Sequence, residues 1–208
     1  MKDKVYFYHM PKTGGTYIKE CMKQSGLVVQ NLNADPRMAF DKKADVYTSH
    51  FWFRGGSTEL LDGKHITFLR HPRDLCRSAF FYFHKHGRPE RVVQPGAQRM
   101  LDVLKRRTAS VETFEQYLAM TSPPYPAGWW PNPDHFDFVG VTELMKDSLG
   151  YLSELIDHEI KPLPVKVNHN LQYSRDPMPG LDDFLMEYFE REVRDWEAAF
   201  DNVYYDHG

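Results

Sequence analysis

The stretch His9-Met10-Pro11-Lys12-Thr13-Gly14-Gly15-Thr16-Tyr17 is the most informative part of this sequence. It follows the apolar β-formers of residues 5–8 and precedes a pattern that predicts an amphipathic helix over residues 16–24. A glycine-containing turn between a strand and a helix is typical of phosphate-binding loops, because backbone N–H groups and the helix N-terminus face the anion. Lys12 adds a mobile positive charge, so the sequence predicts an anion-binding loop after the first strand.

The spacing of this loop differs from that of the Walker loop. The Walker pattern GxxxxGK[ST] places its lysine after the glycines, whereas Lys12 precedes Gly14 and Gly15. The two glycines are expected to let the backbone approach the ligand closely. We therefore expect a nucleotide-like ligand other than ATP.

Strand-like and helical patterns alternate along the rest of the sequence. Strands are expected at residues 4–9, 27–30, 46–49, 65–69 and 136–141, and helices at 16–24, 72–83, 142–156 and 185–200. Gly26 is expected to end the first helix, Pro72 to lie in the first turn of the second, and Thr142 to cap the third. This alternation predicts an α/β fold with a mostly parallel sheet of about five strands and ligands at the strands' carboxyl ends.

Composition narrows the class of protein. The chain has 208 residues, of which 41% are hydrophobic, and this predicts a single domain over residues 1–208. A formal charge of −3 excludes a globally basic nucleic-acid binder. Cys21 and Cys76 are expected to be reduced and buried. No apolar stretch approaches the roughly 20 residues that span a bilayer and no signal-like segment begins the chain, so a cytoplasmic protein is expected.

Two segments interrupt the alternation. Residues 84–107 hold seven basic and two acidic residues, an excess of five positive charges, which indicates either an anionic partner or a solvated helical face. Residues 122–133 are rich in proline and are expected to form a loop. Trp129 and Trp130 in that loop either stack on a flat acceptor or cover the edge of the core.

A second anion-binding motif follows the predicted strand at residues 65–69. Arg70 ends this strand, and Ser78 lies about two helical turns further on, so both are expected to converge on one phosphate. Arg73 and Arg77 either serve the same phosphate or lie on the helix surface. Two anion sites on one sheet predict a ligand with two separated phosphates.

Together the two motifs resemble those of the PAPS-dependent sulfotransferases, most closely the heparan sulfate and uronyl 2-O-sulfotransferase branch. Residues 11–16 resemble the 5′-phosphosulfate loop of the family, and Arg70 with Ser78 resembles its 3′-phosphate motif. The segment Thr48-Ser49-His50-Phe51 is similar to the one that carries the catalytic histidine in that branch. Residues 138–143 and 167–169 resemble its last strand and the segment that closes over the donor.

The resemblance implies a three-layer, P-loop-NTPase-like sulfotransferase fold and PAPS (3′-phosphoadenosine 5′-phosphosulfate) as the donor, with no metal. The donor-binding residues it implies are Pro11, Lys12, Thr13, Gly14, Gly15, Thr16, Tyr17, Arg70 and Ser78. The expected acceptor is a hydroxyl group of a carbohydrate or small molecule.

Sulfuryl transfer assigns roles to two residues. Negative charge grows on the oxygen that leaves sulfur, and Lys12 is expected to stabilise it. A base must accept the hydroxyl proton, and a histidine with a pKa near 6.5 suits that role, so His50 is the expected base and Glu59 its rival. His9 is expected either to shape the loop or to touch the donor. Thr16 is expected to donate to a phosphate oxygen, while Tyr17 packs beside the loop.

Two other functions remain open at this level. A nucleotide kinase-like phosphotransferase is disfavoured because the GK[ST] signature and a clear Mg²⁺-binding acidic pair are both missing. A non-catalytic protein that binds nucleotides or anionic glycans would have no use for a base at His50. The aromatic run at residues 51–53 indicates either a floor for a sugar ring or core packing.

Overall fold

The computed structural model describes residues 3–32, 40–50, 62–76, 78, 130–164 and 181–205. Their contacts divide the chain into two compact units. The first comprises Met1–Arg70, Pro131–His169 and Asp195–Gly208, and the second comprises His71–Trp130 and Asn170–Arg194. The single sulfotransferase domain expected over residues 1–208 stays a prediction.

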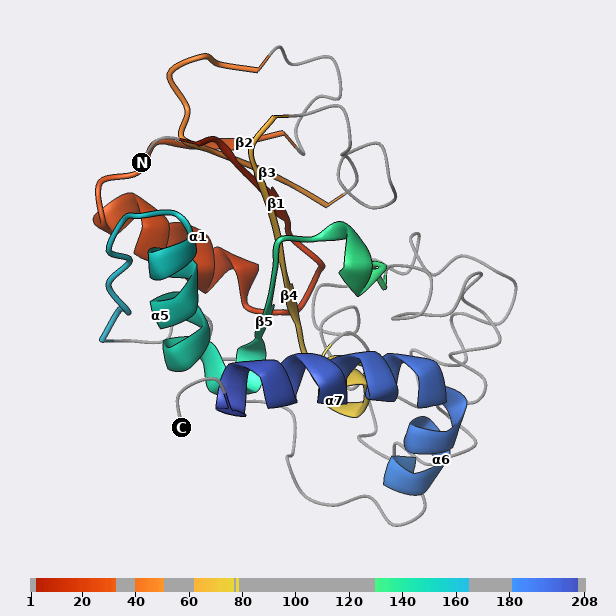
Figure 1. The fold of residues 1–208 in the computed structure, drawn as a ribbon. Coiled ribbons are helices and arrows are strands. Elements are labelled where there is room, and N and C mark those ends of the chain that lie inside the picture. Colours follow the sequence, from red (N-terminus) through yellow and green to blue (C-terminus); the bar gives the residue numbers. More distant parts are fainter. Residues whose placement is uncertain are drawn as a thin grey trace, which may run out of the picture. The chain divides into compact units, whose positions relative to one another are not determined.

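A five-stranded parallel sheet forms the centre of the first unit (Figure 1). Its strands are β1 (Val5–Tyr8), β2 (Val29–Asn31), β3 (Val46–Ser49), β4 (Lys64–Leu69) and β5 (Phe138–Val141), arranged in the order β2-β3-β1-β4-β5. Every pairing is parallel. The predicted parallel sheet is therefore confirmed.

The strand order places a topological switch point beside β1. The chain leaves β1 toward β2 on one side of the sheet and leaves β4 toward β5 on the other. Ligands of open α/β sheets bind where such connections diverge, at the carboxyl ends of the strands. The loop after β1 and Arg70 after β4 both lie at that edge.

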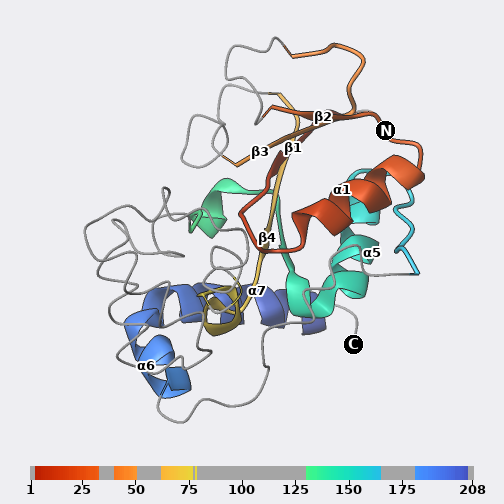
Figure 2. The same ribbon diagram turned by 180° about the vertical axis from the view of Figure 1, so that it is seen from behind.

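Helices α1 (Gly15–Gln24) and α5 (Met145–Leu155) cover the same face of the sheet, as the two opposite views show (Figures 1 and 2). The helical spacing of Ile18, Cys21 and Met22 explains why α1 buries one side. These side chains pack with alternate strand residues, such as Val5 and Phe7, in one core cluster. Intervening strand residues face the other way, and Tyr6 stacks there on Tyr47 and His65 with ring centroids 5.4 and 5.0 Å apart.

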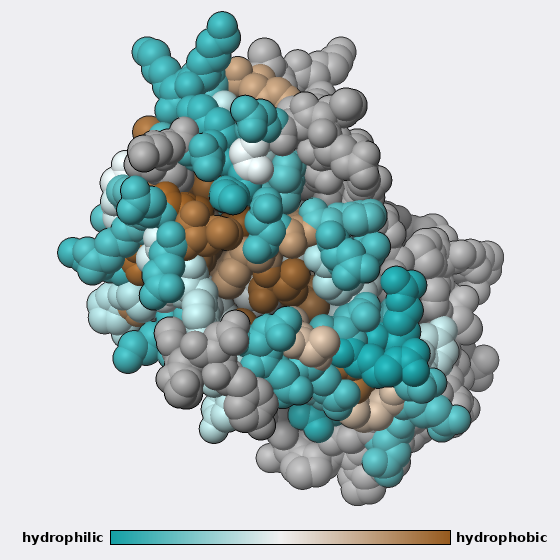
Figure 3. Space-filling view, viewed as in Figure 1, coloured by the Kyte–Doolittle hydropathy of each residue, from teal (hydrophilic) through white to brown (hydrophobic). Residues whose placement is uncertain are grey.

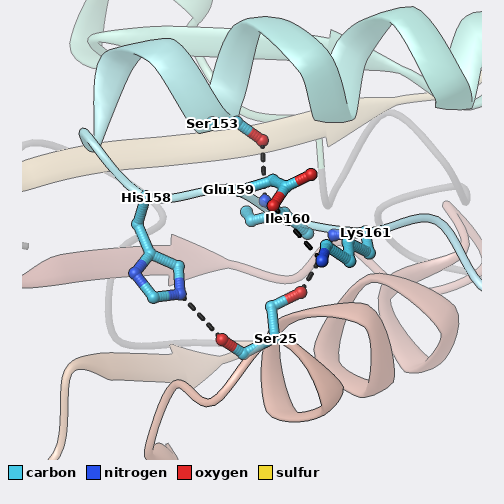
Figure 4. Close-up of polar contacts among 6 residues, drawn as sticks. All are labelled: Ser25, Ser153, His158, Glu159, Ile160 and Lys161. Atoms are coloured by element: carbon cyan, nitrogen blue, oxygen red, sulfur yellow. Dashed lines mark hydrogen bonds and ion pairs between the residues drawn. The ribbon is translucent and has the colours of Figure 1, made fainter.

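The C-terminal end of α1 is tied to the segment that follows α5 (Figure 4). His158 Nε2 donates to the carbonyl oxygen of Ser25 at 2.8 Å, and Lys161 N donates to Ser25 Oγ at 2.9 Å. Gly26 follows with a φ of +92°, so it ends the helix as predicted. These bonds hold α1 at the end opposite to the loop between β1 and α1.

Several boundaries differ from the sequence-based expectations, including that of α5, which begins at Met145 and not at residue 142. Both β2 and β5 begin two residues later than predicted; η4 (Pro133–His135), a single 3₁₀ turn, precedes β5. The C-terminal pattern predicted one helix but forms two, α6 (Leu181–Tyr188) and α7 (Glu190–Tyr205). Hydrogen bonds from Phe189 N to Leu185 O and from Val193 N to Phe189 O continue the helical spacing across the break, so the apolar pattern does not reveal it.

The helix expected after β4 begins in the second unit. Residues 72–76 and 78 are helical, and Pro72 lies in the first turn as predicted. Leu75, Cys76 and Ser78 are buried, and so is Trp130. The predictions for Glu59, Arg77, Trp129 and residues 51–53, 84–107 and 167–169 lie outside the described residues. Within the described part of the chain, no helix is long and apolar enough to cross a bilayer.

Candidate functional site

The loop between β1 and α1 is a tight turn with two left-handed residues. Lys12 has a φ of +70° and Gly14, the N-cap of α1, a φ of +80°. Thr13 Oγ1 donates to the carbonyl oxygen of Met10 at 2.8 Å and closes the turn. A left-handed conformation at a residue with a side chain costs about 1–2 kcal/mol, and such strain concentrates at ligand-binding sites. The turn, closed by the Thr13 bond, thus holds the backbone of Lys12 in a left-handed conformation.

Gly15 begins α1, and a neighbouring side chain explains its small size. A Cβ atom at this position would overlap the imidazole ring of His9. The space beside Gly15 is thus filled by a side chain from the end of β1. Internal packing thus favours glycine at position 15, and its expected role in a close approach of a ligand stays a prediction.

Lys12 and Arg70 bring two positive charges to the switch point. Arg70 Nη1 donates to the carbonyl oxygen of Lys12 at 3.3 Å, which joins the loop after β1 to the end of β4. Burial, and secondarily the charge of Arg70, lowers the pKa of Lys12 to about 8. Both effects disfavour the charged lysine, and a bound anion would reverse them. Lys12 and Arg70 thus place two basic side chains at the predicted edge of the sheet.

Thr142, which follows β5, contacts both the loop between β1 and α1 and the end of β4. It starts η5 (Thr142–Leu144), directly after β5. Its hydroxyl lies 2.8 Å from Leu69 O and 3.0 Å from Thr13 O, and donates its single proton to one or the other. The expectation that Thr142 caps the following helix is wrong: α5 has Leu144 as its N-cap, and no side chain caps it. From the sequence, a threonine directly after a strand is expected to cap the next helix. The carbonyl groups that its hydroxyl contacts belong to residues distant in sequence, Leu69 and Thr13, so a local pattern does not indicate them.

His50 follows β3 and contacts the end of β1. Its Nδ1 donates to the carbonyl oxygen of His9, and the two imidazole centroids lie 4.4 Å apart at 39°. Because a carbonyl only accepts, Nδ1 carries a proton and Nε2 carries the lone pair of the neutral ring. Burial lowers the pKa of His50, the bond to His9 opposes that shift, and Lys19 adds to it. His50 is thus a neutral base at neutral pH.

His9 lies beneath the loop. It is buried, with 7% of its surface exposed, and its ring stacks on Phe7 at 5.6 Å. Burial, then the charges of His50 and Lys19, lowers the pKa of His9 well below the usual range. Among the described residues, none hydrogen-bonds to its buried Nδ1. His9 is thus neutral and held mainly by packing.

The remaining predicted site residues divide between the two units. In the first unit Thr13 is buried, Pro11 and Gly14 are half-buried and Thr16 is exposed in the first turn of α1. Tyr17 donates its hydroxyl to Leu163 O at 3.1 Å, which ties α1 to the segment after α5. Ser78 lies in the second unit, so its convergence with Arg70 on one phosphate stays a prediction. Within the described residues, no three His, Cys, Asp or Glu side chains are grouped as metal ligands.

A separate groove of about 710 Å³ lies in the first unit, between β5, α5 and α7. Figure 3 shows an apolar floor bordered by hydrophilic side chains in this region. The acidic residues that line it are Asp134, Asp137, Glu154 and Asp195. Asp134 and Asp137 precede β5 at its amino end, whereas the loop between β1 and α1 adjoins the carboxyl end through Thr142. Four carboxylates repel an anionic nucleotide, so the groove is not the candidate donor site.

Comparison with known proteins supports the fold. No protein-family model matches the chain, and no curated protein matches its sequence significantly. Among solved structures, the crystal structure of a sulfotransferase from Alicyclobacillus acidocaldarius is similar, with a TM-score of 0.54 and 14% sequence identity. The match covers 95% of each chain. The five-stranded parallel sheet with its flanking helices is therefore an α/β sulfotransferase fold.

Proposed function

We propose that this protein is a PAPS-dependent O-sulfotransferase that acts on a hydroxyl group of a carbohydrate or small molecule. One observation carries the proposal: Lys12, Arg70 and His50 follow three adjacent strands, β1, β4 and β3, at the switch point of the sheet. Two cations and a neutral base at one edge fit an anionic donor and an acceptor that must lose a proton. The sulfotransferase fold of the first unit supports the same reading.

In this mechanism the acceptor oxygen attacks the sulfur atom of the donor in line with the leaving group. The bond between sulfur and the bridging oxygen of the 5′-phosphate breaks, and Lys12 stabilises the charge that develops on that oxygen. His50 Nε2 takes the proton of the hydroxyl. The products are the sulfated acceptor and adenosine 3′,5′-bisphosphate. Arg70 and Ser78 are assigned to the 3′-phosphate by resemblance to the family.

The donor class is tested by thermal stability and by transfer of label. Adenosine 3′,5′-bisphosphate at about 100 times its Kd is expected to stabilise the protein by about 2.7 kcal/mol, which raises Tm by roughly 5–10 °C. ATP with Mg²⁺ is the control and is expected to give no comparable shift. Incubation with [³⁵S]PAPS and a panel of hydroxyl acceptors then identifies the product. Stabilisation by ATP alone would favour the phosphotransferase, and bisphosphate binding without transfer to any acceptor would favour the non-catalytic binder.

The pH dependence of kcat/KM should have two limbs. Activity is expected to rise with pH as His50 loses its proton, at a pH below the ordinary histidine value of about 6.5, because the pKa of His50 is lowered. Activity should fall again near pH 8 as Lys12 becomes neutral. Lys12→Arg should keep the acid limb and remove the alkaline one, because arginine stays protonated. An alkaline limb unchanged in Lys12→Arg would contradict its assignment to Lys12.

A further inference from the structure

His9 contacts both halves of the candidate site. Its ring occupies the space that Gly15 leaves open at the start of α1, and the same ring lies 4.4 Å from the ring of His50. Its backbone carbonyl accepts the Nδ1 proton of His50. His9 therefore contacts the loop between β1 and α1, here called the donor loop, on one side and the proposed base, His50, on the other.

We propose that His9 is a positioning residue that sets the ring plane and the tautomer of His50 relative to the donor loop. The inference deepens the proposed function and rests on it in one respect, that His50 acts as the base. The sequence is compatible with two roles for His9, shaping the loop or touching the donor. The contacts favour a third role, because both the ring and the backbone carbonyl of His9 contact His50.

The carbonyl of His9 acts on the tautomer. A neutral imidazole in water exchanges its proton between two nitrogens, and only the nitrogen without the proton can act as a base. Because the carbonyl only accepts, the bond from Nδ1 selects the form with the lone pair on Nε2. The proton-accepting atom of His50 is thereby chosen before any substrate binds.

The ring of His9 acts on orientation. It is packed between Phe7, Gly15 and His50, so His50 cannot rotate toward it without overlap. None of the described residues hydrogen-bonds to the buried Nδ1 of His9, which points to packing as the contribution of the ring. Lys19 and His50 are the charged or titratable groups whose charges bear on His9, and its burial keeps it neutral. A neutral planar ring should therefore replace it better than a small side chain.

Three single variants test this role by steady-state kinetics. His9→Ala is expected to lower kcat about 10–100-fold, the loss typical of a misplaced catalytic group, and to change the Kd of adenosine 3′,5′-bisphosphate less than about threefold. His9→Phe should stay within about threefold of the wild type in kcat. His158→Ala, the matched control, removes a histidine that binds a backbone carbonyl at the far end of α1 and should leave kcat unchanged. Wild-type kcat in His9→Ala, or equal losses in His9→Ala and folded His9→Phe, would overturn the proposal.

A double variant tests the contact with the loop, whether or not the larger phenylalanine is tolerated. Gly15→Ala is expected to lower Tm and bisphosphate affinity, because the new Cβ overlaps His9. Adding His9→Ala should remove the overlap and restore affinity, while kcat stays at the level of His9→Ala alone. Failure of His9→Ala to restore either Tm or affinity in the Gly15→Ala background would contradict the packing on which the proposal depends.

Nuclear magnetic resonance of the imidazole nitrogens separates this inference from the proposed function. In the wild type we expect His50 to be protonated at Nδ1 and to titrate below 6.5. In His9→Ala water reaches the ring, so its pKa should move up toward 6.5, whereas Nδ1 should stay protonated because alanine keeps the backbone carbonyl that accepts its proton. This pKa shift without sulfuryl transfer by the wild type would refute the proposed function alone. Transfer by the wild type with no shift in His9→Ala would refute the positioning role alone.

Discussion

Replacement of Lys12 by alanine is expected to lower kcat about 10³-fold, comparable to the loss of one preorganised donor at a developing charge. The Kd of adenosine 3′,5′-bisphosphate should rise only about tenfold or less. The reason is that the charge on the bridging oxygen grows mainly in the transition state, so Lys12 stabilises that state more than the bound donor. Single-turnover transfer from PAPS and calorimetry with the bisphosphate measure the two quantities separately.

Lys23→Ala is the matched control for this result. Lys23 lies in the last turn of α1, the helix that follows the loop of Lys12; it is exposed and pairs with Glu20 at 2.7 Å, so both kcat and Kd should stay close to the wild type. Equal losses in kcat/KM and in bisphosphate affinity for Lys12→Ala, with kcat unchanged, would show that Lys12 only binds the donor. The leaving-group role would then be abandoned.

Replacement of His50 by alanine is expected to lower kcat about 10²–10⁴-fold, the usual contribution of a general base. Affinity for adenosine 3′,5′-bisphosphate should stay within about threefold, because Lys12 and Arg70 remain in place. The acid limb of the pH profile should disappear with the imidazole. Assays of sulfuryl transfer from PAPS at several pH values, together with calorimetry of bisphosphate binding, test all three expectations.

Glu59→Gln distinguishes the two candidate bases. If His50 is the base, Glu59→Gln should retain kcat within about threefold. If Glu59→Gln loses turnover while His50→Ala keeps it, the base is the glutamate and the assignment of His50 is wrong. His158→Ala again serves as the control for removing an imidazole elsewhere in the first unit.

The strands and the helices of the first unit were largely predictable from local patterns. Apolar runs of β-formers mark β1, β3 and β4 to within one residue, because buried parallel strands need apolar side chains on both faces. Gly26 marks the end of α1, since its φ of +92° is a conformation that other residues avoid. The division of the C-terminal segment into α6 and α7 was not predictable, since the apolar spacing is continuous across Phe189.

The residues of the candidate site were predicted, but most contacts between them were not. Lys12, Arg70 and His50 follow predicted strands, so their common edge of the sheet follows from parallel topology alone. Thr142 was assigned to the wrong role, because the carbonyls of Leu69 and Thr13 that its hydroxyl meets are 73 and 129 residues away in sequence. The packing of the His9 ring against Gly15 was not predictable either, because it is a contact formed only in the folded chain.

Local sequence thus established the parallel α/β sheet, the loop after its first strand and the kinds of charge around that loop. These features depend on neighbouring residues, whose spacing and conformational preferences are written in the chain. Only the tertiary structure determined the strand order. It also determined the lowered pKa of Lys12 beside Arg70, the tautomer of His50 and the packing of His9 against Gly15. Each of these arises from burial and from contacts between residues distant in sequence, which no local pattern contains.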